Sequence, residues 1–291
     1  MTAVLSNPRT QPLTPESIVR ELRNLPSAPK VLPRLKALLR DGNSQLDRIV
    51  RLIRLDPALA ARILQIANSP YYFTGARCLT VEEAVARVGF EEVYVLVSHA
   101  VAPEMINRPV AAYHMTSDQM WAHSVGCGLA AEALSERVGV DRKAAYTLGL
   151  LHGVGMIAID EWARRQGAEL KMAILPFPIE ATRSERAQFG FTQADVGAAL
   201  LESWEFPPEI SDPVRYQYAP GAATSWGALA ALLMAARWIR SAVLAPNPNE
   251  LPPLPQPAQV RPAGLAVAAL TDAVPLVASE LEAVRSVLEE S

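Results

Sequence analysis

The sequence predicts an all-α protein, and three observations support this fold class. Apolar residues recur at helical spacing through most of the 291 residues, cap residues precede several of these runs, and no alternating strands separated by tight turns are found. We expect two helical lobes, residues 14–108 and 109–291, joined near Pro103 to Pro109.

The first helix is predicted to follow a loose, polar tail over residues 1–13. Thr14 can cap its free amides, and Pro15 suits the first helical position, where no amide hydrogen is needed. Two prolines then interrupt the chain before a helix over residues 31–39.

Cap signals of the same kind open the next helices. Ser44 is predicted to cap a short helix, and Asp56 with Pro57 opens a longer one that Asn68 and Ser69 end. These polar residues are interpreted as caps rather than as ligand contacts. Replacing Asn68 with alanine is therefore expected to lower stability by on the order of 1 kcal/mol.

The first lobe is predicted to end with two further helical segments. Thr80 and Glu83 have the spacing of a capping box, and Gly89 suits a left-handed helix stop. Residues 91–100 are expected to continue as a helix.

The second lobe is predicted to begin with a long helix that Ser117 caps and Gly139 ends. Asp141 is expected to cap a helix over residues 142–151.

Glycines flank the histidine that follows this helix. Gly153 and Gly155 are expected to loosen the backbone around His152 before a helix over residues 156–163.

The rest of the chain is read as three helices and one connector. Residues 190–192 are predicted to form a loop and cap before a helix over residues 193–204, and residues 226–244 form an apolar helix. Residues 245–262 are rich in proline and are expected to form an extended surface connector. A last helix is predicted over residues 276–289.

Composition and charge disfavour several classes of protein. Half of the residues are hydrophobic, a fifth are charged, and the net charge of −3 shows no bias toward nucleic acid or anionic membranes. A basic stretch over residues 20–62 is interpreted as solvated helix faces, because no aromatic residues interleave with its arginines.

Two features of the sequence bear on where the protein is found. Cys78 and Cys127 lie far apart and indicate neither a disulfide framework nor a thiolate metal site. No basic-then-apolar leader is expected, and the apolar runs near residues 229–244 and 264–277 are interrupted by charged residues or proline. A cytoplasmic location is expected.

The histidines His123 and His152 are the residues that could carry metal-assisted hydrolysis. A divalent ion needs several nitrogen and oxygen ligands, yet Gly153 supplies none where a carboxylate would be the natural third ligand. A site would have to recruit a distant carboxylate such as Asp160 or Asp195.

Other kinds of chemistry are not indicated by the sequence. Ser124 directly follows His123, so on a helix the two side chains point in different directions. The glycines near His152 are not followed by the Lys-Ser/Thr pair of a phosphate-binding loop.

Taken together, these segments resemble the HDOD family, bacterial signalling domains related to the HD-type metal-dependent phosphohydrolases. The resemblance covers about Thr14 to Pro220 and rests on several motifs in the expected order. These are Leu25–Pro29, Asp56-Pro57 to Leu64, Ala67-Asn68-Ser69-Pro70-Tyr71-Tyr72, Thr80–Gly89, Trp121–Ser124, Gly149–Gly155, Phe189–Leu201 and Trp204–Pro207.

Several departures from the family pattern remove possible ligands. Enzymatic HD proteins have a His-Asp pair where this chain has His152 and Gly153. Gln193 stands where relatives often have a histidine, and Gln217 with Tyr218 replaces a frequent His-His pair. The resemblance thus implies that the second lobe is a degenerate HD-like core, and no metal or other cofactor is expected.

The leading functional hypothesis is a non-catalytic regulatory protein of a bacterial signalling pathway, with no catalytic residues. It would act by binding a protein partner or a small regulatory ligand, with no nucleic-acid partner and no membrane insertion. The alternative is a divergent metal-dependent phosphohydrolase or phosphodiesterase that uses His123, His152 and a remote carboxylate. Imidazole nitrogens more than ~6 Å apart would count against that alternative.

A third hypothesis is a ligand-sensing pocket between the lobes. Tyr71, Tyr72, Trp121 and Trp204 could line it, although core packing explains such aromatic residues more often.

Overall fold

The computed structural model describes residues 13–22, 35, 38, 46–89, 92–93, 109–172, 178–245, 247 and 251–289. Within these residues the fold is all-helical, as predicted, and the sole β feature is an isolated bridge between Val110 and Met115. The longer helices are α1 (Pro15–Glu21), α3 (Leu46–Ile53), α4 (Pro57–Asn68), α5 (Val81–Val88), α7 (Ser117–Val138), α8 (Arg142–Leu151), α9 (Val154–Gln166), α10 (Pro178–Phe189), α11 (Gln193–Ser203), α12 (Pro208–Tyr216), α13 (Gly227–Val243) and α15 (Val267–Glu289).

Most of the predicted helix starts are confirmed by side-chain hydrogen bonds. Asp56 accepts from the amides of Ala58 and Leu59, and Asp141 accepts from the amide of Ala144. Thr14 and Thr80 each form a capping box, the latter with Glu83 as predicted. These caps depend only on neighbours in sequence, which is why the sequence indicates them.

Several predicted boundaries are wrong. Thr116, not Ser117, caps α7, because its hydroxyl accepts from the Gln119 amide while Ser117 is already helical. The last helix begins at Val267 and continues through Pro275. The helix tolerates this proline because it loses only one amide donor and is packed against neighbouring helices.

The predicted extended connector is also partly wrong, because it contains two short helical segments. They are α14 (Pro257–Val260) and η5 (Arg261–Ala263), and α13 packs against both. Two helices, α10 and α12, were not predicted from the sequence.

Some predicted features lie outside the described residues. They are most of the tail, most of the helix over residues 31–39, Ser44, most of residues 91–100 and most of the connection between the lobes.

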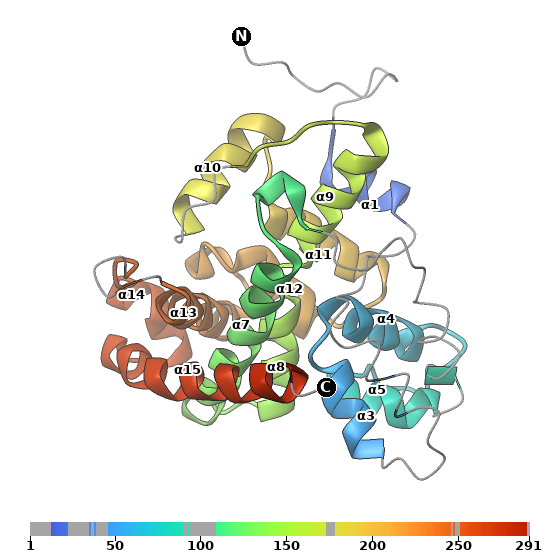
Figure 1. Ribbon diagram of the computed structural model, residues 1–291, viewed down its shortest axis with the longest axis horizontal. Helices are drawn as coiled ribbons and strands as arrows, with labels where there is room; N and C mark the ends of the chain where they lie inside the picture. Colours follow the sequence, from blue (N-terminus) through green and yellow to red (C-terminus); the bar gives the residue numbers. More distant parts are fainter. Residues whose placement is uncertain are drawn as a thin grey trace.

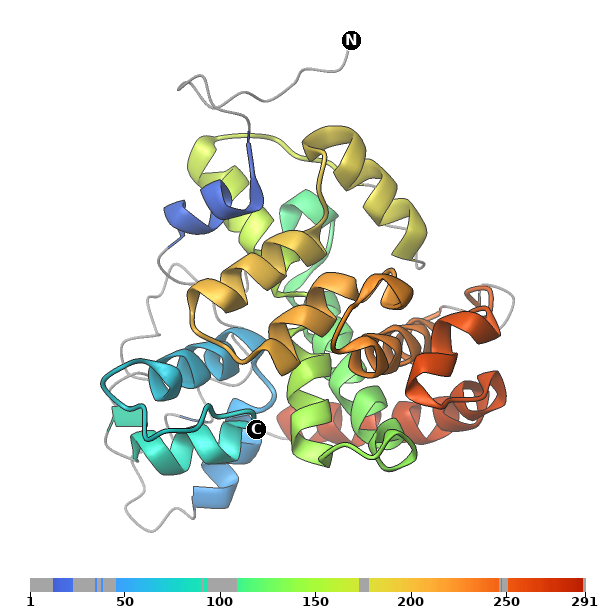
Figure 2. The ribbon, with the colours of Figure 1, turned by 180° about the vertical axis from the view of Figure 1, so that it is seen from behind.

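The helices gather into a small group and a larger bundle (Figures 1 and 2). The small group contains α3, α4 and α5, and the bundle is built on α7 and α8 with α13 and α15 alongside. α1 packs against α9 and α11 of the larger group. The division at residue 109 remains a prediction.

Arg54 connects the small group to the bundle. Its guanidinium lies 3.4 Å from Glu82 of α5 and 3.4 Å from Glu132 of α7. The same group stacks 4.2 Å from the ring centre of Tyr146, whose hydroxyl donates to the Arg54 carbonyl at 2.9 Å. Since Tyr146 is on α8, these contacts hold the two groups of helices together.

Glycines allow the central helices to approach closely. A Cβ atom on Gly149 of α8 would collide with the Cys127 carbonyl of α7. Gly155 lies inside α9 rather than in a loosened segment, and its Cβ would collide with the Gln193 carbonyl of α11. The expectation that Gly155 loosens the backbone is therefore wrong, because a helix that touches another backbone this closely has no room for a side chain.

Within the described part of the chain, no single helix has the length and apolarity needed to cross a membrane. One pair, Pro257–Ala263 and Val267–Ser286, meets both conditions when taken together but is bent by 76°.

Candidate functional site

The two histidines singled out in the sequence lie against each other. His123 projects from α7, and His152 is the residue that ends α8. Their rings stack with centroids 4.6 Å apart and planes inclined by 19°. The packing of α7 on α8 thus brings together two residues that are 29 positions apart in sequence.

A backbone contact fixes the protonation of the His152 ring. Its Nδ1 lies 2.7 Å from the Gly149 carbonyl oxygen. Because a carbonyl can only accept, Nδ1 carries the hydrogen and Nε2 presents a lone pair. Nε2 of His152 and Nδ1 of His123 are both buried without a hydrogen-bond partner.

The surroundings keep both imidazoles neutral. Burial lowers the pKa of His123 and of His152 well below 6.5, and the positive charge of Arg240 lowers both further. At neutral pH the pair therefore adds no positive charge to the site.

Gly153 lies beside this pair, as the cap residue of α9. A Cβ atom there would be 3.4 Å from Nδ1 of His123 and 3.0 Å from the terminal methyl of Met120. A side chain at position 153 would therefore face His123.

Gln193 and Gln217, which stand where relatives often have histidine, are buried. Nε2 of Gln217 donates to the carbonyls of His152 at 3.0 Å and Val214 at 2.8 Å. Nε2 of Gln193 donates to the Tyr218 hydroxyl at 2.9 Å. The Oε1 atoms of both glutamines have no hydrogen-bond partner.

Two arginines of α13 were not predicted from the sequence to belong to this cluster. They are Arg237 and Arg240, which are 3% and 8% exposed. The guanidinium of Arg237 stacks 3.9 Å from the Tyr218 ring centre and donates to the Gln217 carbonyl at 3.1 Å. Neither arginine forms an ion pair with a described residue. Their position in an otherwise apolar helix could have indicated this role. Charged residues in such a helix are rarely buried unless they have a partner.

A second missed residue is Glu185, on the unpredicted helix α10. Its carboxylate accepts hydrogen bonds from the Tyr113 hydroxyl at 2.7 Å and from the backbone amide of Gln193 at 3.0 Å. Burial raises the pKa of Glu185 to about 7, although both hydrogen bonds and the nearby Arg237 oppose that rise. Glu185 therefore connects the buried polar residues to the start of α11.

These residues do not fit a divalent metal. Among the described residues, no three His, Cys, Asp or Glu side chains converge as a ligand group. Asp160 accepts from the Ala112 amide at 2.8 Å, and Asp195 caps α11 through Thr192. Two buried guanidinium groups also raise the electrostatic energy of any cation placed near the imidazoles.

The remaining motif residues have structural contacts. Asp56 and Pro57 start α4, while Asn68 bonds both backbone groups of Cys78, accepting from its amide at 2.7 Å and donating to its carbonyl at 3.1 Å. Ser69 donates to the Ile66 carbonyl at 2.7 Å.

The aromatic residues named for the interlobe pocket have different environments. Trp121 and Trp204 are buried, whereas Tyr71 is 86% exposed and stacks edge-on against Tyr72.

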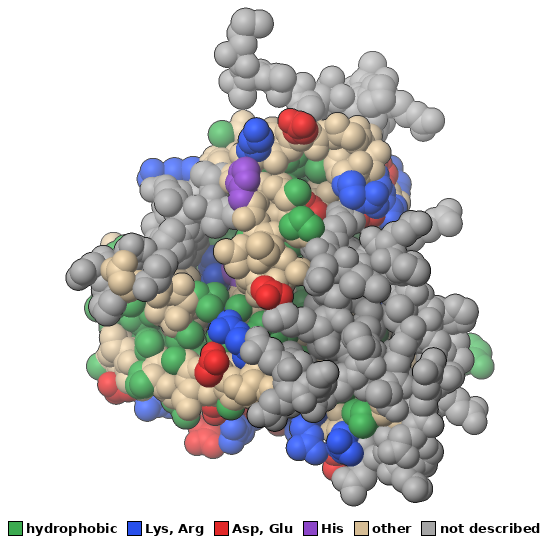
Figure 3. Space-filling model, viewed as in Figure 1, with side chains coloured by type: hydrophobic (Ala, Val, Ile, Leu, Met, Phe, Trp, Pro, Cys, Tyr) green, Lys and Arg blue, Asp and Glu red, His purple; other side chains and the backbone are tan. Residues whose placement is uncertain are grey.

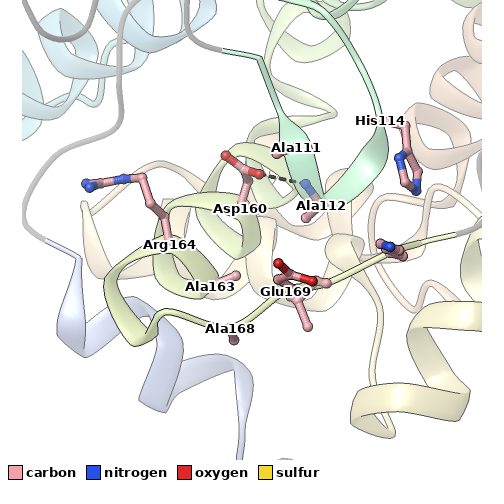
Figure 4. A pocket seen from close by; sticks show the side chains of 10 residues that line it. Ala111, Ala112, His114, Asp160, Ala163, Arg164, Ala168 and Glu169 are labelled. Carbon is pink, nitrogen blue, oxygen red and sulfur yellow. Dashed lines mark hydrogen bonds between the residues drawn. The ribbon is translucent and has the colours of Figure 1, made fainter.

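A separate surface cavity of about 420 Å³ lies between the short helix η2 (Ala111–Tyr113) and α9 (Figure 4). Asp160 is among its lining residues, and its carboxylate is held by the Ala112 amide. None of the imidazole or arginine residues described above lines this cavity.

Comparison with known proteins identifies relatives of the chain. A model of the HDOD domain matches residues 25–220. An uncharacterized protein of Treponema pallidum (strain Nichols) is 27% identical over 210 residues, which are 69% of this chain and 39% of that protein. The chain thus spans about two fifths of the length of this relative.

Two solved structures share the fold. The MmoQ response regulator of Methylococcus capsulatus superimposes with a TM-score of 0.66 at 23% identity, over 87% of this chain and 99% of that one. A virulence factor of Campylobacter jejuni gives a TM-score of 0.65 at 15% identity, over 92% and 96%. At these identities the likeness shows the fold alone.

Proposed function

The chain belongs to the HDOD domain family, a signalling-related group with an HD-like helical fold, and we propose that it is a non-catalytic regulatory protein. In this proposal it acts in the cytoplasm by binding a protein partner of a signalling pathway or a small regulatory ligand. Its HD-like core serves as a scaffold rather than as a metal-dependent active site.

One observation carries this proposal. The space beside His123 where a side chain at position 153 would lie belongs to a glycine, and the positive charges of Arg237 and Arg240 lower the pKa of both imidazoles. A metal that activates water needs carboxylate or imidazole ligands and a site without excess positive charge. Around His123 the described residues supply the two imidazoles but no group of three ligands, and the two arginines add positive charge.

Metal content and turnover together test the proposal. The purified protein is analysed for bound metal and incubated with cyclic dinucleotides, nucleotides and a generic phosphodiester in the presence of Mn²⁺. We expect no stoichiometric metal and no turnover above that of His152→Ala. Stoichiometric metal with turnover that disappears in His152→Ala would overturn the proposal.

Two observations support the alternative, a divergent phosphohydrolase. His152 donates from Nδ1 to a backbone carbonyl and leaves Nε2 unbonded, which is how metal-binding histidines are commonly oriented. The imidazoles also stack within 4.6 Å rather than lying apart. The measurement of bound metal and substrate turnover distinguishes the two candidates, because only a hydrolase would convert a phosphodiester or nucleotide.

A further inference from the structure

We propose that Arg237, Arg240 and the unbonded ring nitrogens of His123 and His152 form a binding site for a phosphate group. The ligand is either inorganic phosphate or the phosphate of a small phosphomonoester. This inference rests on the proposed non-catalytic function, because it assigns the same site a ligand that is bound and not hydrolysed.

The positive charges of Arg237 and Arg240 are not balanced by a carboxylate partner among the described residues. Both arginines are nearly buried. The acidic group that Arg237 influences is Glu185, which is itself bonded to Tyr113 and Gln193. A buried cation without a partner is strongly destabilising. A bound anion would remove this cost by balancing the positive charge of the cluster.

The same cluster contains buried polar atoms that have no hydrogen-bond partner. The Nε atoms of Arg237 and Arg240 are buried donors without partners. Nε2 of His152 and Oε1 of Gln217 are buried acceptors without partners. Unpaired buried groups of both kinds indicate a bound species that the protein atoms alone do not supply.

The chemistry of these atoms favours phosphate over other small species. Water can satisfy the hydrogen bonds but not the charge. A carboxylate satisfies the charge but has no hydrogen to donate to Nε2 of His152 at neutral pH. A hydrogen phosphate has oxygens for the guanidinium groups and a hydroxyl for the imidazole, and arginine is well suited to bind phosphate.

The packing of the helices also supports a binding site at this cluster. Gly126 of α7 leaves room for Arg240, since a Cβ there would lie 3.2 Å from Cγ of Arg240. The imidazoles come from α7 and α8, and the arginines come from α13, which packs against both helices. A tetrahedral anion could therefore be held from two sides.

His123 is the member of the cluster with an intermediate exposure, whereas His152, Arg237 and Arg240 are buried. Figure 3 shows that histidine and basic side chains reach the surface on the face that it draws. In this proposal the phosphate group enters from the side of the cluster on which His123 lies.

Binding is tested with the full chain by equilibrium dialysis and ³¹P NMR. The probes are inorganic phosphate, adenosine 5′-monophosphate and glucose 6-phosphate, with acetate as the anion that carries no hydroxyl. The variants are Arg237→Gln and Arg240→Gln, and Arg285→Gln is the control because Arg285 is a surface residue paired with Glu282.

We expect one phosphate group per chain, weak or absent acetate binding, and at least about a tenfold loss of affinity in Arg237→Gln and Arg240→Gln. Arg285→Gln should bind like the unmodified chain. Preference for inorganic phosphate or for an ester identifies the source of the group. If a glutamine variant does not fold, the corresponding lysine variant, which keeps the charge, replaces it and should show a smaller loss.

Two outcomes would overturn the inference. One is the absence of saturable binding of every phosphate probe by the unmodified chain, which would leave the non-catalytic function standing. The other is equal affinity in the arginine variants and the unmodified chain. Release of inorganic phosphate from a bound ester would instead contradict the non-catalytic function while leaving the phosphate site in place.

Discussion

The imidazole rings of His123 and His152 stack 4.6 Å apart, and the position that would place a third side chain beside them is Gly153. The hydrogen bond that orients His152 comes from its own helix, through the Gly149 carbonyl. The pair is thus held by local geometry and by helix packing, so each contact can be changed separately.

Gly153→Asp should raise the pKa of His123. The backbone at Gly153 has φ −101° and ψ 7°, which a non-glycine residue can adopt, and aspartate is a favourable cap residue. The new carboxylate would lie near Nδ1 of His123 and favour its protonated form. NMR titration of the imidazole signals measures the change. Gly153→Asn is the uncharged control, and identical titrations for the two variants would contradict the placement.

Glu185→Gln should remove part of the pH dependence of stability. The pKa of Glu185 is raised from 4.5 to about 7 in the folded protein, so between these values the unfolded chain releases a proton that the folded chain retains. Stability contributed by Glu185 is therefore full below pH 4.5 and falls as the pH rises toward 7, by on the order of 3 kcal/mol.

Urea unfolding between pH 4.5 and 7 tests this predicted loss of stability with rising pH. It is measured for the unmodified chain, Glu185→Gln and Glu169→Gln. Glu169 is an exposed glutamate, so its variant should follow the unmodified profile. The free energy of unfolding of Glu185→Gln should fall less over this range. If the free energy of unfolding of Glu185→Gln changes with pH in the same way as that of the unmodified chain, the Glu185 carboxyl is ionised throughout this range and the prediction is wrong.

Asn68→Ala should lower the free energy of unfolding by about 2 kcal/mol, more than a simple cap would. The amide of Asn68 makes two hydrogen bonds to the Cys78 backbone, so its loss leaves both buried groups unpaired. Ser69→Ala, which removes one partly exposed bond to Ile66, should cost about 0.5 kcal/mol. Thermal or urea unfolding measures both, and equal losses would mean that the Cys78 contacts do not matter.

Gly155→Ala should destabilise the bundle by about 3 kcal/mol, because its methyl group would overlap the Gln193 carbonyl and force α9 and α11 apart. Gly221→Ala is a matched control, since nothing lies within 4 Å of a Cβ there. That variant should stay within about 0.5 kcal/mol of the unmodified chain. Equal stability of the two variants would contradict the close approach of α9 and α11.

The structure shows which predictions local sequence can support. Thr14, Asp56, Thr80 and Asp141 cap helices as expected, because a cap and its amides lie within three residues of each other. The all-helical fold and the family follow from the same local patterns. Helix α10 escaped prediction because it is mostly polar, and helix α12 because Pro213 in its interior is read from sequence as a helix breaker.

The sequence by itself determined the helical fold and the missing carboxylate at Gly153, since both depend on residue type and near neighbours. The tertiary structure alone decided that His123 meets His152, that Glu185 reaches α11, and that Arg237 and Arg240 are buried where their charges lower the pKa of both imidazoles. These relationships join helices distant in the chain. They depend on which helix faces are brought together, and the spacing within any one helix does not specify that.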